Sequence, residues 1–406
     1  MRFDWFVKKV ELRGPVSDLT WDSRMFVLHI INNMDVGGAE HFLVQLMRAQ
    51  IGMGWHVGVV TLGENNPLVH DIYGSGILYR GCDRARLNDP RLLVDLVAVL
   101  QRLRPDVVHT HLFYADAFGR LAARLAGIEA IVSTEHSTEA WALSGKRRLA
   151  MRWGARLGHR MVAVSEAVRQ TAAARLGMPA SRIALIPNGI DLEPLRQAAP
   201  LPRDELGLAA ADFVVGCLGR MVASKGYDAL LRAVARLVGA SAAPQALPVR
   251  VLMIGDGPER RALGELAESL GRGAHVRWLG FRKDVPQLLK ALDVFALPST
   301  FEGHSIALLE AMAAGCACLV SDIAEITDTV GEAAVRVPAG DDVAMATALR
   351  ALWDDPPRRT RLGQTAQTSV QRFSITEAAT RYVALYSEIL GIGGSRPSST
   401  ARRSSA

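Results

Sequence analysis

Two acidic residues, Glu302 and Glu310, lie eight positions apart in the segment 297–322, LPSTFEGHSIALLEAMAAGCACLVSD. Glu310 interrupts the run 306–314, IALLEAMAA, whose composition favours a helix that is apolar on every side and therefore buried. Ser305 can cap the start of this helix. A buried carboxylate is unfavourable unless a partner binds it. One acid in the loop before the helix and one on the helix therefore suit a ligand with hydroxyl and anionic groups, such as a nucleoside-diphosphate sugar.

A basic pair, Arg220 and Lys225, lies in the segment GRMVASKG, which follows the apolar run 213–218. In a loop between a strand and a helix, two cations five positions apart can reach the same polyanion. The planar guanidinium and the compact ammonium together suit a diphosphate. The alternative is a solvated basic loop, which the flanking glycines and the position at a strand end make less favoured.

Three histidines, His109, His111 and His136, fall where predicted strands end. Ligands of parallel sheets bind at the carboxyl ends of the strands, but a single histidine there is more often structural than functional. No Asp or Glu at ligand spacing accompanies the three histidines, so we predict no metal site among them. Cys316 and Cys318 are interpreted as small buried residues rather than metal ligands.

The elements that must position these residues are apolar strands that alternate with helices. Before residue 192 the predicted strands are 26–31, 56–62, 76–81, 106–111, 130–136, 161–166 and 183–191. A proline-containing stretch, 192–212, is interpreted as a linker. The pattern then restarts with strand segments at 213–220, 249–258, 276–281, 294–299 and 318–322. This alternation predicts two parallel sheets, each covered by helices on both faces.

Composition agrees with a globular protein of two domains, because 406 residues exceed one typical core and 49% of them are hydrophobic. No run of eighteen apolar residues is present, and acidic and basic residues interrupt the N-terminus, so neither a membrane span nor a signal peptide is expected. Four cysteines suggest reduced thiols and a cytoplasmic location. The net charge of +6 favours acidic partners such as nucleotides or anionic lipid.

The segments PSTFEG and EAMAAG around the two acids resemble the signature of the retaining glycosyltransferases of family 4. Weaker similarity in GGAE, HTHLFYAD and STEHS extends the resemblance over 26–390. It implies the GT-B fold, with two Rossmann-like, doubly wound α/β domains facing a cleft. It also implies transfer of a hexose-type sugar from a nucleoside-diphosphate sugar to a hydroxyl acceptor, in the synthesis of a polysaccharide, a glycolipid or a cell-envelope glycan. The donor sugar, the base and the acceptor stay open.

The resemblance implies roles for individual residues. His136 and Glu302 would lie at the transferred sugar, and Glu310 would bind the ribose. Arg220 and Lys225 would stabilise the leaving diphosphate without a metal ion. The catalytic residues implied are His136, Glu302, Arg220 and Lys225. The donor-binding residues implied are Gly38, Arg220, Lys225, Gly255, Gly257, Glu302, Gly303, His304, Ser305, Ile306 and Glu310.

Retention normally requires a carboxylate nucleophile, and none stands out in this sequence. The resemblance implies attack from the front face instead, in which the leaving-group oxygen takes the proton of the acceptor. No metal or other cofactor is expected.

The expected division of the chain has five parts. Residues 1–24 form an extension, 25–195 an N-terminal acceptor domain and 205–373 a donor domain. The helix 375–390 crosses back onto the first domain. Residues 391–406 are rich in Gly, Ser and Arg, which predicts a disordered tail.

Two other functions remain open. A sugar-nucleotide epimerase can share this architecture, although the Arg220 and Lys225 pair together with E-x7-E argues against it. A non-catalytic sugar-nucleotide-binding protein is also conceivable, but every expected donor-side motif is present. A nucleotide dehydrogenase is less favoured still, because the loop after the first strand, 32–38, lacks G-x-G-x-x-G.

A basic segment is the remaining feature. Residues 140–165 contain no acidic side chain, and a helix over 146–160 is predicted there. Its basic residues are Lys146, Arg147, Arg148, Arg152, Arg156 and Arg160, of which the last four step by four and form one stripe. An apolar stripe of Leu149, Trp153, Leu157 and Met161 lies beside it. This pattern fits either a helix on an anionic membrane surface or an ordinary surface helix. The first interpretation implies a lipid-linked acceptor and a peripheral position on the cytoplasmic face.

Overall fold

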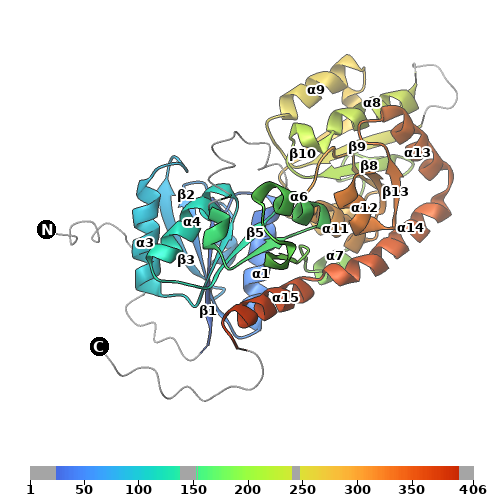
Figure 1. Cartoon of the computed structure of the whole chain (residues 1–406). Coiled ribbons are helices and arrows are strands. Elements are labelled where there is room, and N and C mark those ends of the chain that lie inside the picture. Colours follow the sequence, from blue (N-terminus) through green and yellow to red (C-terminus); the bar gives the residue numbers. More distant parts are fainter. Residues whose placement is uncertain (1–23, 138–151, 153, 240–246, 393–406) are drawn as a thin grey trace, which may run out of the picture.

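The computed structural model describes residues 24–137, 152, 154–239 and 247–392. Two parallel sheets, each with helices on both faces, lie side by side and form the two halves of the molecule (Figure 1). This arrangement confirms the predicted fold class. The predicted extension and tail lie outside the described residues, apart from positions 24, 391 and 392.

The first half contains a seven-stranded sheet in the order β3-β2-β1-β4-β5-β6-β7. Its strands are β1 (Phe26–Ile31), β2 (His56–Gly63), β3 (Leu78–Arg84), β4 (Val107–His111), β5 (Ile131–Glu135), β6 (Arg160–Ala163) and β7 (Ile183–Leu185). Its helices are α1 (Gly38–Gly52), α2 (Val69–Ile72), α3 (Arg91–Leu103), α4 (Phe113–Leu125) and α6 (Glu166–Leu176). The strand order reverses between β1 and β4, and such a reversal opens a ligand crevice at the carboxyl ends of the strands.

The second half repeats this arrangement with six strands in the order β10-β9-β8-β11-β12-β13. These are β8 (Phe213–Leu218), β9 (Val249–Ile254), β10 (Val276–Gly280), β11 (Val294–Leu297), β12 (Ala317–Ser321) and β13 (Ala334–Val337). The helices are α8 (Tyr227–Val238), α9 (Arg260–Ser269), α10 (Val285–Lys290), α11 (Ile306–Ala314), α12 (Ala324–Val330), α13 (Asp342–Asp354) and α14 (Pro356–Ser369). The reversal between β8 and β11 places the loops that follow these two strands at the crevice.

The helix α11 has the bounds that its sequence predicted. The Ser305 hydroxyl accepts a hydrogen bond from the amide of Leu308 at 3.4 Å, and Gly315 ends the helix in the left-handed conformation with φ of +81°. Seven of the nine residues of α11 are buried. Because the helix is apolar all round, burial on every side fixes its position and leaves Glu310 as its single acidic group.

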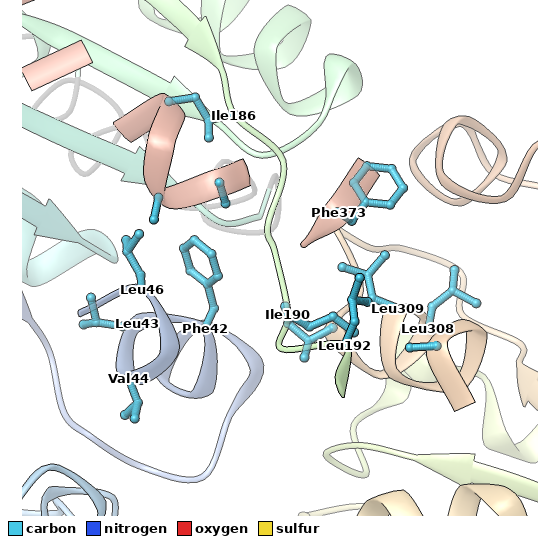
Figure 2. Close-up of a cluster of buried hydrophobic side chains, with 14 of the residues drawn as sticks. Phe42, Leu43, Val44, Leu46, Ile186, Ile190, Leu192, Leu308, Leu309 and Phe373 are labelled. Carbon is cyan, nitrogen blue, oxygen red and sulfur yellow. The ribbon is translucent and has the colours of Figure 1, made fainter. Parts of the chain in front are cut away.

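The chain passes between the halves twice, and the two crossings lie together. The amide of Ile190 donates to the carbonyl of Phe373 at 3.0 Å, and the amide of Ile375 donates to the carbonyl of Ile190 at 2.8 Å. Beyond the second crossing, α15 (Ile375–Ile389) packs against α1 of the first half (Figure 1). Figure 2 shows the apolar core around these crossings, which joins α1, the segment around Ile190 and α11.

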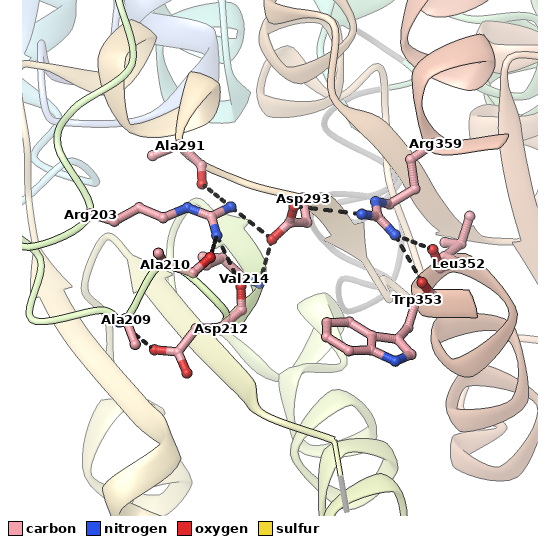
Figure 3. A network of polar contacts seen from close by, with 10 residues as sticks. All are labelled: Arg203, Ala209, Ala210, Asp212, Val214, Ala291, Asp293, Leu352, Trp353 and Arg359. Carbon is pink, nitrogen blue, oxygen red and sulfur yellow. Dashed lines mark hydrogen bonds and ion pairs between the residues drawn. The ribbon is translucent and has the colours of Figure 1, made fainter. Parts of the chain in front are cut away.

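The segment interpreted as a linker is structured and belongs largely to the second half. It contains α7 (Glu193–Gln197), which packs on α10 and α11. Farther along, Arg203 donates to the Asp293 carboxylate at 2.9 Å, and the amide of Val214 donates to the same oxygen at 2.8 Å. Figure 3 shows this network, in which Arg359 of α14 approaches Asp293 from the other side. These contacts anchor the linker at the amino ends of β8 and β11, away from the crevice.

The helix predicted over 146–160 ends before residue 160, earlier than the spacing of its basic residues indicated. Arg152 and residues 154–157 are helical, but Arg160 is the first residue of β6. The Arg160 guanidinium pairs with Glu388 of α15 at 3.0 Å. The prediction that Arg160 continues the stripe of Arg152 and Arg156 is therefore wrong, because the helix ends before the strand begins; Met161 is likewise a buried residue of β6. Residues 138–151 and 153 lie outside the described part of the chain. Among the described residues, no helix has the length and apolar character needed to cross a bilayer.

Candidate active site

A cleft of about 410 Å³ lies between the carboxyl ends of the two sheets. The first half contributes residues 36–41 at the start of α1, together with Leu112, His136 and Asn188. The second half contributes residues from the segments after β8, β9, β10 and β11 and from the start of α11. A cavity of about 850 Å³ lies elsewhere and contains none of the predicted site residues. It is lined by residues 100–101, 104–106 and 126–130 together with His159, Ile389 and Leu390. We therefore place the candidate site in the smaller cleft.

Every predicted catalytic and donor-binding residue except Gly257 lines this cleft. Gly257 instead packs against the loop after β8, where a Cβ atom would lie 2.4 Å from the carbonyl oxygen of Met221. Gly255 has a φ of +118°, and a Cβ there would lie 2.2 Å from the carbonyl oxygen of Gly219. Both glycines thus allow the loop after β9 to support the loop that carries Arg220.

Lys225 and Glu302 are in direct contact, although they are 77 positions apart in the chain. The Lys225 Nζ donates to Glu302 Oε1 at 2.6 Å, and the Ser299 hydroxyl donates to the same oxygen at 2.7 Å. Only 8% of the Glu302 side chain is exposed. The pair compensates both charges in a nearly buried position, and the other carboxylate oxygen and the remaining ammonium hydrogens stay available to a ligand.

Arg220 is exposed at the cleft, in the loop after β8. Within the described residues its guanidinium forms neither a hydrogen bond nor an ion pair. Five N–H groups in a planar fork are therefore free to bind an anion bidentately. Together with the start of α11, where the first turn of a helix carries partial positive charge, Arg220 makes this side of the cleft attractive to phosphate.

Glu310 faces the same cleft from the second turn of α11. Desolvation of the Glu310 carboxyl group raises its pKa to about 7. Its carboxyl group has no hydrogen-bond or ion-pair partner among the described residues. A partly exposed acid with this environment is suited to a ligand that brings its own hydroxyl donors.

Glu40 is a second acid of the cleft, which the sequence did not single out. It lies in the first turn of α1, and burial is the main cause that raises the pKa of Glu40 to about 7. The GGAE segment was the available signal for it. Gly38 also lines the cleft, but a Cβ there would make only an ordinary contact of 3.5 Å with Ile306. Neighbouring protein atoms therefore do not require a glycine at this position.

The two halves touch at the loop before α11. A Cβ on Gly303 would lie 1.9 Å from the carbonyl oxygen of His136, so no other residue fits without a shift of the backbone. Beside it, the Asn188 amide donates to the carbonyl oxygen of His304 at 3.0 Å. The His304 ring packs edge-on against Phe373 with centroids 4.9 Å apart, and burial lowers the pKa of His304 to about 3. The side chain of His304 is thus a neutral packing group.

Of the three strand-end histidines, only His136 reaches the cleft. Its Nε2 lies 3.1 Å from His111 Nδ1, whereas its Nδ1 is buried and has no protein partner among the described residues. His109 and His111 lie behind it with no exposed surface. Burial lowers the pKa of His136 to about 4, so its ring is neutral near pH 7.

Within the described residues, one group of side chains has the spacing of a metal site. Ligand nitrogens of His29, His109 and His111 lie within 4.8 Å of one another. These rings are already hydrogen-bonded to each other and to neighbouring side chains, and they do not line the cleft. The absence of a metal requirement therefore stays a prediction about the reaction.

Three further cleft residues were not predicted from the sequence. Phe281, Arg282 and Val285 follow β10 and line the cleft, and 59% of Phe281 is exposed. A single exposed aromatic residue after a strand gives no distinctive signal in one sequence. Its position beside the loop of Gly255 suits it to a flat ligand group.

Comparison with known proteins finds a glycosyltransferase family model in each half of the chain. The model described as Glycosyltransferase Family 4 matches residues 36–194, and that described as Glycosyl transferases group 1 matches residues 212–355. The chain is 31% identical over 246 residues to the UDP-Gal:alpha-D-GlcNAc-diphosphoundecaprenol alpha-1,3-galactosyltransferase of Escherichia coli. That match covers 58% of this chain and 63%, less than two thirds, of the relative.

A second relative and a solved structure match over greater lengths. The 2-deoxystreptamine glucosyltransferase of Streptomyces kanamyceticus is 27% identical over 321 residues, which cover 74% of this chain and 81% of that protein. The structure of Anabaena Alr3699/HepE in complex with UDP and glucose superposes with a TM-score of 0.78 at 22% identity, over 90% of this chain and all of that one. This likeness concerns the fold. From the two family models and these relatives, the chain belongs to the glycosyltransferases of family 4 and group 1, with the GT-B fold.

Proposed function

We propose that this glycosyltransferase moves a hexose from a nucleoside-diphosphate sugar onto a hydroxyl group of a glycan or lipid-linked acceptor. UDP is the first nucleotide to test. The observation that carries the proposal is the convergence of Arg220, Lys225, Glu302 and Glu310 on one cleft from two separate segments of the chain. The names of the E. coli relative and of the Anabaena complex, which include UDP-Gal, UDP and glucose, support the choice of donor.

Each group in the cleft has a part in the proposal. Arg220 and the start of α11 bind the diphosphate, and Glu310 accepts hydrogen bonds from the ribose. Lys225 bridges the diphosphate and Glu302, whose second carboxylate oxygen is directed to hydroxyl groups of the sugar. As the glycosidic bond breaks, negative charge grows on the diphosphate where Arg220 and Lys225 already lie, which lowers the barrier without a divalent ion.

The reaction proceeds with retention by attack from the front face. Glu302 is the acid assigned to the sugar. One of its oxygens already accepts two hydrogen bonds, which makes it a poor nucleophile. The acceptor hydroxyl instead approaches from the side of the leaving diphosphate, and a diphosphate oxygen takes its proton. His136, which is neutral, contributes a hydrogen bond to the sugar rather than a charge.

Glycan of the cell envelope is the proposed destination of the sugar. The acceptor named for the E. coli relative is a diphosphoundecaprenol-linked sugar, which is a membrane lipid. In this chain the exposed Arg152 and Arg156 lie on one short helical stretch of the first half. Contact of this region with the anionic cytoplasmic face of a membrane would bring the cleft to such an acceptor.

A screen of nucleotide sugars tests the proposal. UDP-, GDP-, ADP- and dTDP-sugars are added separately, and the melting temperature is recorded with wild-type protein and with Glu310→Ala. A donor at 100 times its Kd should stabilise the wild type by about 2.7 kcal/mol and the variant much less. Products formed with the best donor are then identified, in EDTA and with added magnesium. Formation of free sugar or of a glycoside supports the proposed transferase activity. Formation of an epimerised nucleotide sugar would show that the protein is an epimerase instead.

A further inference from the structure

A line of buried hydrogen bonds runs from α1 through the first sheet to the cleft. Gln50 Oε1 lies 2.9 Å from His29 Nε2, His29 Nδ1 lies 3.0 Å from His111 Nε2, and His111 Nδ1 lies 3.1 Å from His136 Nε2. Gln50, His29 and His111 have no exposed surface. The donor side of the reaction described above uses only the last member, His136.

The protonation of these rings is restricted by their burial. Desolvation lowers the pKa of His29 and of His136 to about 4, and that of His111 well below its ordinary value. Each ring is therefore neutral near pH 7 and carries a single N–H, so that one nitrogen donates and the other accepts. Three such rings in a row must all point in the same direction.

The amide of Gln50 sets that direction. Its nitrogen donates to the hydroxyl of Tyr386 at 3.4 Å, so its oxygen accepts from His29 Nε2. Each following ring then donates through Nε2, and the line ends with an unprotonated Nδ1 on His136. The opposite orientation would leave an N–H on His136 Nδ1, which is buried and has no acceptor among the described residues, and an unpaired buried N–H is rarer than an unpaired acceptor.

We propose that Gln50, His29 and His111 are positioning residues that hold His136 in the Nε2–H tautomer and present its Nδ1 lone pair as an acceptor for a hydroxyl group. The assignment of that hydroxyl to the bound sugar rests on the proposed function, whereas the tautomer itself does not. A neutral acceptor selects an uncharged hydroxyl and gives no attraction to phosphate, which complements the basic side of the cleft.

A second branch of the network supplies a matched control. The Tyr386 hydroxyl lies 2.6 Å from His109 Nδ1, His109 Nε2 lies 2.7 Å from Thr134 Oγ1, and Thr134 Oγ1 lies 3.0 Å from the hydroxyl of Tyr382. This branch is equally buried but ends on α15 rather than at the cleft. A change there perturbs the same core without interrupting the line to His136.

Nitrogen NMR of protein labelled with ¹⁵N-histidine reads the tautomers directly and needs no donor. The His136 signals are assigned by their loss in His136→Gln. Wild-type protein should show a protonated Nε2 and an unprotonated Nδ1 at His136. Gln50→Met, which removes the acceptor at the far end, should shift both signals toward a mixture of tautomers. Gln50→Glu, which keeps an acceptor oxygen, should restore the single form, and Thr134→Val should leave it unchanged.

The wild-type spectrum alone can overturn the proposal, even if Gln50→Met fails to fold. A proton on His136 Nδ1 would reverse the line, and an unchanged His136 tautomer in folded Gln50→Met would remove Gln50 from it. A divalent metal that survives gel filtration, and whose chelation shifts the signals of His29, His109 and His111, would replace the line with a metal site. Failure of the donor screen would leave this spectrum unaffected, so the two proposals fail separately.

Discussion

At the scale of single residues, charge in the cleft is arranged in advance of the ligand. Lys225 and Glu302 compensate each other, Arg220 is unpaired within the described residues, and Glu310 has a pKa raised to about 7 by burial. Anions bind where the uncompensated cation lies, and hydroxyl groups bind where the acids lie. Two predictions at this scale separate the roles of these residues.

Lys225→Ala should lower turnover by ~10²-fold or more, because it removes a group that stabilises charge on the leaving diphosphate. Initial rates at saturating donor measure the effect. The change also leaves Glu302 without its cation, so the double variant Lys225→Met with Glu302→Gln is the control for lost stability. If both proteins remain folded and the turnover of Lys225→Ala matches the wild type, its role in the reaction is refuted.

Donor affinity should fall as the pH is lowered below 7. A carboxyl with a raised pKa holds its proton in the folded protein, so its ionised fraction drops about tenfold for each pH unit below 7. Ribose hydroxyls donate hydrogen bonds and therefore prefer the ionised form. The raised pKa of Glu310 also affects the free energy of unfolding. Because the folded protein holds this proton more tightly than the unfolded chain, the ligand-free protein loses stability as the pH rises from about 4.5 to about 7.

Calorimetric titrations between pH 5.5 and 8 measure this dependence. Because Glu40 also has a pKa of about 7 and lines the cleft, Glu310→Gln and Glu40→Gln are compared. The dependence should disappear in Glu310→Gln and persist in Glu40→Gln. Persistence in Glu310→Gln would remove Glu310 from the ribose site.

At the scale of elements, the loop before α11 is fixed by contact between the two halves. Gly303→Ala places a Cβ 1.9 Å from the His136 carbonyl oxygen, so the loop or the halves must move apart. We expect a lower melting temperature and a donor affinity reduced by tenfold or more, since about 1.4 kcal/mol suffices for that factor. Gly264→Ala in α9 is the control, because a Cβ there meets only the end of the Arg260 side chain at 3.3 Å. Equal behaviour of the two variants would contradict the proposed contact.

Elements with strong local signals were predictable from the sequence. The bounds of α11 follow from nine residues of uniform composition, a serine cap and a terminal glycine, all within eleven positions. The strand β13 was missed, because it lies at a sheet edge, only one of its four residues is buried, and it lacks a continuous apolar run. The end of the basic helix was also misplaced, because a spacing of four continued by coincidence into β6 through Arg160.

Contacts between distant segments were not predictable. The pairing of Lys225 with Glu302, the approach of Gly303 to His136 and the line from Gln50 to His136 join residues between 21 and 167 positions apart. Each depends on the register of strands and on the crossing of the chain between halves, which no local pattern encodes. The motif residues could therefore be assigned to one cleft from the sequence. The residues that contact them in the structure could not be identified in that way.

At the scale of the whole molecule, the location of the acceptor remains to be tested by sedimentation with vesicles. Protein should pellet with vesicles containing anionic lipid at low salt, and pelleting should decrease with added salt. Arg152→Ser with Arg156→Ser should weaken it further, whereas Arg261→Ser, which removes a 91% exposed arginine from the second half, should not. Wild-type protein that stays in the supernatant at low salt would end the membrane proposal and leave the transferase intact.

The most direct test of the central claim is whether the cleft binds the diphosphate of a nucleotide. Calorimetry compares the diphosphate and the monophosphate of the nucleotide selected by the donor screen, using wild-type protein and Arg220→Ala. We predict one site per chain, tighter binding of the diphosphate by the wild type, and loss of most of that preference in Arg220→Ala. Equal affinity of both nucleotides for the wild type, or an unchanged preference in Arg220→Ala, would contradict the assignment of this cleft as the donor site.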